Sequence, residues 1–365
     1  MDIICDKSIC TGCAACANIC PKNAIKMLED NKGFKYPYID ESICIDCNLC
    51  KAKCPAVNTL SSNFPLKLFA CKNLNSEIRA SSSSGGVFQE LANYILDIKH
   101  GFVFGAAFDN EFKVKHLGVN NKQDLEKLKK SKYVQSNTDN IYVDFKKAIE
   151  NNKSILFSGT PCQVEAVKNF IPSTNDNVFL LDLICHGVPS PKVFEDYKSL
   201  LEKKYKSKII NINFRFKNET TTQNISVDFE NGKNYTSSLC DGDLFYTLFL
   251  KDIILRESCY NCKYKQVPRI SDITIADFWG IEKGSAKKLN DNKGVTLVLI
   301  NTEKGLKLFE NIKHKFEYLE VSLEDCVNYN CFSNFKKPET SATFWEDYLI
   351  NGLKEVWFYI NQTSF

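Results

Sequence analysis

Residues 10–21 read CTGCAACANICP, and residues 44–55 read CIDCNLCKAKCP. Both stretches have the spacing C-x2-C-x2-C-x3-C-P, in which three thiolates bind one 4Fe-4S cluster and the fourth reaches another cluster. Two crossed ligand sets follow, Cys10, Cys13, Cys16 and Cys54 for one cluster, and Cys44, Cys47, Cys50 and Cys20 for the other.

Structural zinc is the alternative, but zinc sites usually need only paired C-x2-C hooks. The doubled four-cysteine run, with a proline after each, favours iron–sulfur clusters. Residues 34–40, FKYPYID, are predicted to form a strand between the two halves. We therefore predict an α+β, bacterial-type two-cluster ferredoxin domain over residues 1–60.

Composition narrows the class of protein. A chain of 365 residues with 44% hydrophobic and 25% charged residues is typical of a globular protein with two or three domains. No apolar run approaches the roughly 18 residues of a membrane span, and the first residues lack the pattern of a secretory signal. A net charge of +3 does not favour nucleic acid as a partner.

The cysteine usage indicates a compartment. The count of 17 is odd, and the cysteines cluster at metal-ligand spacing rather than in the pattern of a small secreted protein. We therefore expect a reducing, cytoplasmic location. A homo-oligomer is compatible with the sequence.

Beyond a turn-rich linker at residues 57–65, strand-like and helix-like segments alternate. The expected strands are residues 66–71, 102–108, 154–158, 178–184 and 296–300, and residues 87–98 have the apolar stripe of a helix. This alternation predicts a larger α/β domain. We divide it into residues 61–150 and 151–335, followed by a helical tail at 336–365. The chain has no G-x-G-x-x-G string, which disfavours a Rossmann dinucleotide site.

Four further cysteines could form a third metal site. Cys162 follows a predicted strand and sits in the first turn of a helix opened by Pro161, where a thiolate is favoured. Cys185 ends the next predicted strand, so parallel pairing would bring both thiols to one crevice. Cys259 and Cys262 form a C-x2-C pair. The alternative is that Cys162 and Cys185 are buried small hydrophobes and that the pair binds zinc or nothing.

Other segments could hold a ligand. Residues 80–86, ASSSSGG, combine hydroxyls and glycines before a helix, which suits a phosphate cradle or simply a helix cap. The basic residues 125–136 could hold a pyrophosphate or form a solvated helix face. His186 could donate a proton or make a structural hydrogen bond, and Asp277 could bind a ligand hydroxyl or cap a turn. We assign no catalytic acid or base.

The strings SSSSGG, SKYVQS, LFSGTPCQVEAVK, CHGVPSP, SCYNCKYK and SDITIADFWG occur in this order over residues 71–308. They resemble the beta subunit family of coenzyme F-420 hydrogenase/dehydrogenase, whose relatives include hydroxymethyl chlorophyll a reductase. SGTPCQ and CHGVPS are the most specific strings. Arg215 and Lys217 resemble a basic spot of this family.

The resemblance implies an FAD-containing oxidoreductase with a further 4Fe-4S cluster beside the flavin. Carried over by motif, the flavin contacts would be Ser83, Ser84, Gly85, Gly86, Lys132, Gln135, Ser136 and Thr160. The ligands of the third cluster would be Cys162, Cys185, Cys259 and Cys262.

We therefore expect an iron–sulfur flavoprotein that exchanges electrons with an external carrier such as a ferredoxin, or with a redox partner subunit. Its flavin would pass them to or from a small organic or deazaflavin-type substrate. One alternative is a non-catalytic electron-transfer subunit of a larger redox complex. Another is a binding module with zinc at the C-x2-C pair and no flavin. The substrate and the direction of electron flow stay open.

Overall fold

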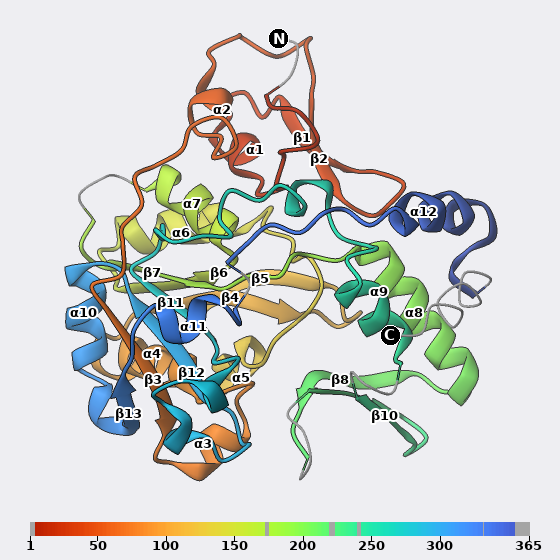
Figure 1. Ribbon diagram of the computed structural model, residues 1–365. Coiled ribbons are helices and arrows are strands. Elements are labelled where there is room, and N and C mark those ends of the chain that lie inside the picture. The colour runs from red at the N-terminus through yellow and green to blue at the C-terminus, as the bar shows by residue number, and fades with distance from the viewer. Residues whose placement is uncertain (1–3, 172–174, 219–222, 239–241, 331, 355–365) are drawn as a thin grey trace.

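The computed structural model describes residues 4–171, 175–218, 223–238, 242–330 and 332–354. A small N-terminal domain stands above a larger α/β domain built on a mixed sheet (Figure 1). The expected fold class of an α+β ferredoxin-like domain followed by an α/β domain is confirmed at this level. Of the predicted C-terminal tail, α12 (Thr340–Asn351) is helical, and residues 355–365 lie outside the described part.

The small domain is built from two similar halves. α1 (Ala15–Ile19) precedes β1 (Ile25–Glu29), which pairs antiparallel with β2 (Lys35–Ile39), and α2 (Leu49–Ala52) follows. The residues before the two helices, Ala14 and Asn48, have φ of 60° and 59°. Equivalent left-handed residues at equivalent places show that both cysteine runs take the same backbone path into a helix.

The large domain is centred on an eight-stranded sheet with the order β13-β3-β12-β11-β7-β6-β4-β5. The strands are β3 (Lys67–Asn73), β4 (Phe102–Phe108), β5 (Val114–Val119), β6 (Ile155–Gly159), β7 (Val178–Leu183), β11 (Ile273–Asp277), β12 (Thr296–Ile300) and β13 (Phe316–Glu320). The four central strands β11, β7, β6 and β4 are parallel, and the outer pairs are antiparallel. Parallel central strands are buried on both faces, which explains their continuous apolar sequences.

Helices cover both faces of this sheet. One face packs against α4 (Val87–Asn93) with its π-helical continuation η1 (Tyr94–Ile98), α5 (Lys122–Leu128) and α10 (Glu303–Glu310). The other face packs against α6 (Ile141–Glu150) and α7 (Pro161–Phe170). The short helices α3 (Ser76–Ala80) and α11 (Glu324–Val327) lie near β3 and its neighbours. Within the described ranges, no helix is long and apolar enough to cross a bilayer.

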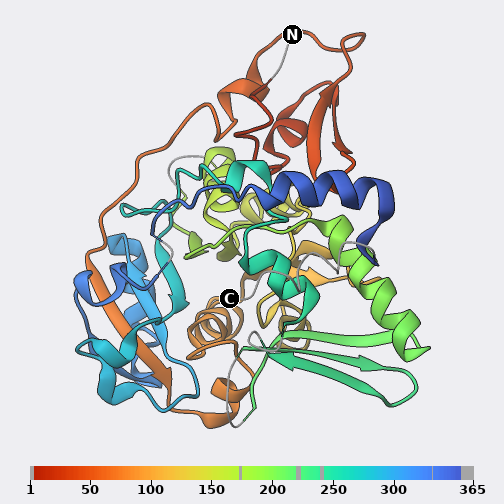
Figure 2. The same ribbon diagram turned by 45° about the vertical axis from the view of Figure 1, so that its right-hand side comes forward.

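A second, three-stranded sheet of order β10-β9-β8 stands beside the large one (Figure 2). It consists of β8 (Ile209–Phe216), β9 (Asn224–Phe229) and β10 (Asn234–Ser238). It shares a core rich in aromatic residues with α8 (Pro191–Tyr205), α9 (Leu244–Leu250) and α12. The end of β8 thereby reaches back to the carboxyl ends of the central strands.

The small domain is packed directly on the large one. Ala14 and Ala15 belong to the same buried cluster as residues of α6, α7 and β6. The linker is also attached, because the backbone N–H of Leu60 donates to the buried carboxylate of Glu165 at 2.8 Å, and Asn63 pairs with Arg269. The first cysteine run therefore faces the large sheet, whereas the second faces away from it (Figures 1 and 2).

Candidate iron–sulfur and cofactor site

Each of the two predicted ferredoxin ligand sets surrounds its own small cavity. One cavity is lined by the predicted ligands Cys10, Cys13, Cys16 and Cys54 and also by Cys5, and the other by Cys20, Cys44, Cys47 and Cys50. We call them the inner and the outer cluster pocket. The fourth cysteine of each run crosses to the other pocket, as the spacing predicts. Each pocket thus presents the four predicted thiols that a 4Fe-4S cluster requires, and Cys5 is a fifth cysteine in the wall of the inner pocket.

Local sequence explains the position of Cys162. Thr160 caps α7 in a capping box with Gln163, whose side-chain oxygen accepts from Thr160 N at 3.0 Å, and Pro161 occupies the first helical position. The preceding strand, β6, ends on the side of the sheet where the carboxyl ends of the parallel strands meet, and binding sites of α/β proteins lie on that side. Cys162 thus lies in the first turn, with its sulfur 3.1 Å from Thr160 Oγ1.

The structure brings the four remaining candidate cysteines together. Burial raises the pKa of the Cys162 and Cys185 thiols, and the charges of Cys259 and Cys262 raise both further. We call these four residues the third thiol group. Thiolates crowded in a buried site need a compensating cation, which an iron–sulfur cluster or a zinc ion supplies. Among the described residues, no group of three or more His, Cys, Asp or Glu side chains is arranged so that it could hold a metal ion.

The third thiol group lies next to the inner cluster pocket. The charge of Cys13 also raises the pKa of Cys162, and both act on Tyr264. The hydroxyl of Tyr142 on α6 donates to the Cys13 carbonyl at 2.8 Å, which fixes the first cysteine run against the large domain. The two sets of thiols therefore adjoin across the domain interface.

A cavity of about 490 Å³ opens beside the third thiol group. This volume lies in the range of cofactor and ligand pockets. The cavity is bounded by residues 82–84, by the segment 128–134, and by the carboxyl ends of β6, β7 and β11. Cys185 belongs to its wall, so the thiol group and the cavity share a residue.

Most of the residues carried over as flavin contacts line this cavity: Ser83, Ser84, Gly86, Lys132, Ser136 and Thr160. Gly85 and Gln135 are not part of the wall. Gly85 is pressed against the sheet, since its N–H donates to Thr296 Oγ1 at 2.8 Å and an added Cβ would lie 2.2 Å from the Cys71 carbonyl oxygen. Gln135 instead donates to the Thr11 carbonyl of the small domain at 3.0 Å.

The basic segment 125–136 differs from a solvated helix face. α5 ends at Leu128, and residues 129–136 form a loop along the cavity. Lys132 Nζ donates to three backbone carbonyls, of Lys127, Lys129 and Lys130. Burial lowers the pKa of Lys132 to about 7, and the charge of Lys130 adds to this effect. A cation held in the wall by backbone oxygens is suited to an anionic ligand group.

A network of neutral groups that the sequence did not indicate forms part of the wall. Burial lowers the pKa of His116 to about 4, so its ring is neutral at pH 7. Its Nε2 lies 3.0 Å from the Ser158 carbonyl and its Nδ1 lies 2.8 Å from Ser136 Oγ, which in turn accepts from Gln163 Nε2 at 2.8 Å. Through Gln163 and Thr160 the network reaches Cys162. His116 lies on β5, and nothing in the sequence around it indicated that its side chain would line the cavity.

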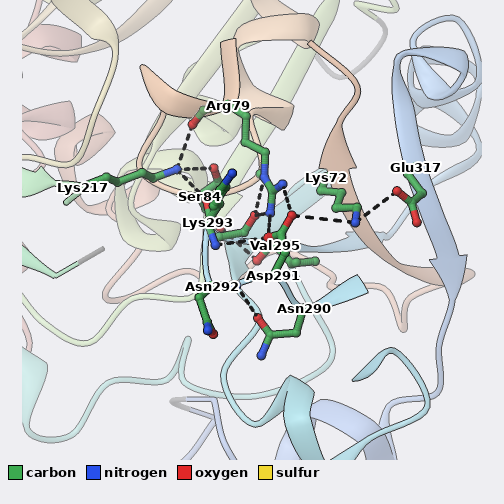
Figure 3. Close-up of polar contacts among 12 residues, drawn as sticks. Lys72, Arg79, Ser84, Lys217, Asn290, Asp291, Asn292, Lys293, Val295 and Glu317 are labelled. Atoms are coloured by element: carbon green, nitrogen blue, oxygen red, sulfur yellow. Dashed lines mark hydrogen bonds and ion pairs between the residues drawn. The ribbon is translucent and has the colours of Figure 1, made fainter. Parts of the chain in front are cut away.

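The end of β8 supplies a second basic spot. Buried Arg215 donates to Asp277 at 2.5 Å and to the Tyr133 hydroxyl at 3.0 Å, and both Arg215 and Asp277 line the cavity. Asp277 thus pairs with an arginine in addition to ending β11. Two residues on, Lys217 Nζ donates to the carbonyls of Arg79, Ser84 and Lys293 (Figure 3). These hydrogen bonds connect the small sheet to residues 80–86, which we call the serine-rich loop.

His186, which also lines the cavity, is held by Asp252, with 2.7 Å between Nε2 and Oδ1. Its ring stacks on Phe335 at 5.2 Å between centroids. The hydrogen bond that the sequence left as an alternative to catalysis is therefore present.

Residues 152–325 match the family model for the C terminus of the beta subunit of coenzyme F420 hydrogenase/dehydrogenase. Residues 9–58 match the 4Fe-4S dicluster domain. Residues 152–325 therefore match this beta subunit family, and a 4Fe-4S dicluster domain lies in front of them. The predicted family is confirmed, and the matched range contains all four cysteines of the third thiol group but begins after the serine-rich loop.

A solved structure of the F420-reducing NiFe hydrogenase complex from Methanosarcina barkeri includes a similar chain, with 18% sequence identity and a TM-score of 0.49. The similarity covers 72% of this chain and 84% of that one. No curated protein matches the sequence.

Proposed function

We propose that this chain is an iron–sulfur flavoprotein oxidoreductase with three 4Fe-4S clusters and one FAD. The observation that carries the proposal is that Cys185 is both part of the third thiol group and part of the wall of the 490 Å³ cavity. A cluster held there would lie beside whatever fills the cavity. Clusters exchange single electrons and a flavin exchanges one or two, so this adjacency would connect one-electron and two-electron chemistry.

Residue roles follow from this placement. The eight ferredoxin cysteines would bind two clusters, and Cys162, Cys185, Cys259 and Cys262 would bind the third. Ser83, Ser84, Gly86, Lys132, Ser136 and Thr160 would contact the flavin directly, whereas Gly85 would support the serine-rich loop and Gln135 would support the domain interface. Lys132 would pair with a phosphate of FAD, since it is the cation held in the cavity wall by three carbonyls.

The outer cluster pocket is the proposed point of electron exchange with a carrier or partner subunit. Its ligand Cys47 is exposed, and Ile43 and Ile45 beside it are 46% and 56% exposed. Electrons would then pass through the inner pocket and the third thiol group to the cavity, where a small organic or deazaflavin-type substrate would react.

Cofactor content tests the proposal. We expect anaerobically purified protein to contain about twelve iron atoms, three cubanes of four, and one FAD per chain. The variant Cys185→Ala should lose about four irons while the ferredoxin clusters stay, whereas Cys71→Ala, at a buried cysteine of β3 outside both pockets, should lose none. Eight irons and no flavin in the wild type would contradict the proposal.

A non-catalytic electron-transfer subunit is the second candidate, and the match to a beta subunit favours it. The two functions differ in what the isolated chain does. If it is an enzyme, FAD reduced through the clusters should be reoxidised by a small organic acceptor added to the chain alone. Reoxidation only by a partner protein would support the second candidate.

A further inference from the structure

Arg256 is a cation that is completely removed from solvent, with an exposed fraction of 0%. Its backbone belongs to the large domain and leads directly into the third thiol group. Its N–H donates to the Val188 carbonyl at 3.0 Å, and its carbonyl accepts from the N–H of Cys259 at 2.9 Å. Burying a charge of this kind is costly unless specific partners compensate for it.

Its side chain crosses the interface and enters the small domain. Nε donates to the Cys10 carbonyl at 2.7 Å, and Nη2 donates to the Lys35 carbonyl at 2.9 Å. Nη2 also lies 3.7 Å from Cys10 Sγ, which is a ligand position of the inner cluster pocket. Nη1 donates to the Gln135 side chain at 3.1 Å, so the residue predicted as a flavin contact instead orients this arginine.

The small domain is shaped to receive the guanidinium. Its central carbon lies 4.3 Å from the ring centroid of Tyr36 and 5.4 Å from that of Phe34, which is a cation–π arrangement. Gly12 leaves room for the guanidinium group, because a Cβ at this position would lie only 2.8 Å from Arg256 Nη1. Backbone oxygens, aromatic faces and a cysteine sulfur surround the charge, and none of these named contacts is a carboxylate. A cluster with thiolate ligands would supply the missing negative charge.

We propose that Arg256 raises the reduction potential of the cluster in the inner pocket and fixes that pocket against the third thiol group. The inference rests on the proposed function, since it needs the inner cluster. A reduced cluster carries one more negative charge than an oxidised one, so a buried cation in contact with a ligand sulfur favours reduction. This charge would favour electron transfer from the outer cluster to the inner one, and a single residue connects the ligand loops of Cys10 and Cys259.

The test is an anaerobic redox titration of the full-length protein followed by EPR. Arg256→Gln removes the charge and should shift the midpoint potential of one ferredoxin cluster to a more negative value. Arg256→Lys keeps the positive charge but loses the planar guanidinium group, whose N–H groups donate to several acceptors at once. It should keep the potential near that of the wild type, while hydrogen exchange at residues 34–37 becomes faster. The matched control is Lys35→Gln, which removes another interface cation, the partner of Asp139 at 2.5 Å, and should leave both potentials nearly unchanged.

The outcomes are separable. If the wild type shows no ferredoxin-type EPR signals, the cofactor assignment itself fails. If the signals are present but Arg256→Gln leaves every potential unchanged, or shifts it no more than Lys35→Gln does, only the role of Arg256 is overturned. If Arg256→Gln does not fold, Arg256→Lys decides both parts of the proposal. A large negative shift of the potential although the charge is kept would overturn the electrostatic role, and unchanged exchange at residues 34–37 would overturn the role in fixing the interface.

Discussion

Lys132 shows at the scale of one residue how the cavity favours an anion. Its amine is buried and held by carbonyls, and its pKa falls to about 7 from an ordinary value of 10.5. A phosphate beside it would restore the charged form, so binding of an anionic ligand would be coupled to proton uptake.

We therefore predict that the affinity of the flavin-free protein for FAD is pH-dependent. It should be constant below pH 7, where Lys132 is already charged, and should fall above pH 7 by up to about tenfold per pH unit. Titration of the apoprotein with FAD between pH 6 and 9 measures this. Lys132→Met should weaken binding and remove the dependence, whereas Lys127→Met, at an exposed lysine paired with Asp124, should change neither. A dependence that persists in Lys132→Met would assign it to another group.

Gly85 allows the serine-rich loop to approach β3 closely. Because an added Cβ would overlap the Cys71 carbonyl, Gly85→Ala should cost about 2–3 kcal/mol in the free energy of unfolding. Gly105→Ala is the control, since its Cβ would meet only Leu128 at an ordinary distance of 3.6 Å. Chemical denaturation of both variants decides the matter, and equal losses of stability would contradict the close approach.

At the scale of elements, an ion-pair clamp holds the loop of residues 290–294 beside the serine-rich loop (Figure 3). Arg79 at the end of α3 donates to both carboxylate oxygens of Asp291 and to the Gly294 carbonyl, and Lys72 on β3 lies 3.9 Å from Asp291. The hydrogen bonds from Arg79 lower the pKa of Asp291 from 3.8 to about 2.

This clamp should make a pH-dependent contribution to stability. A carboxyl whose pKa is lower in the folded than in the unfolded chain stabilises the fold above pH 3.8, and the contribution is lost as the pH falls towards 2. Asp291→Asn should therefore lower the melting temperature at pH 7, and the difference from the wild type should shrink between pH 4 and 3. Asp144→Asn, at an exposed aspartate of α6 away from this clamp, serves for comparison. A difference that stays constant with pH would show that the ion pair is not its cause.

The elements themselves were largely readable from the sequence. The strands predicted at residues 102–108 and 296–300 have those bounds, because continuous apolar runs between turn residues have few other solutions in an α/β fold. Pro161 marked the start of α7 for a local reason that tertiary structure did not change. Side-chain direction was not readable. Gln135 turns to the small domain and His116 to the cavity because of packing between distant segments.

At the scale of the whole molecule, the outer pocket adjoins the inner pocket, the inner pocket adjoins the third thiol group, and the third thiol group adjoins the cavity. The crossed ligands make a specific prediction. Cys54→Ala should disturb the inner cluster although its own run belongs mainly to the outer pocket, and Cys20→Ala should disturb the outer cluster. The inner cluster is the one whose potential should respond to Arg256→Gln. EPR titration of the two variants identifies which signal each removes, and the opposite assignment would contradict the crossed arrangement.

The same crossing has a consequence for how the protein is made. The outer pocket has all four of its predicted ligands once the chain has been synthesised through Cys50, and the inner pocket only once it reaches Cys54, because each pocket draws on both runs. A nascent chain that has exposed only the first run therefore offers the inner pocket three of its predicted ligands and the outer pocket one. A domain truncated between the two runs would complete neither set.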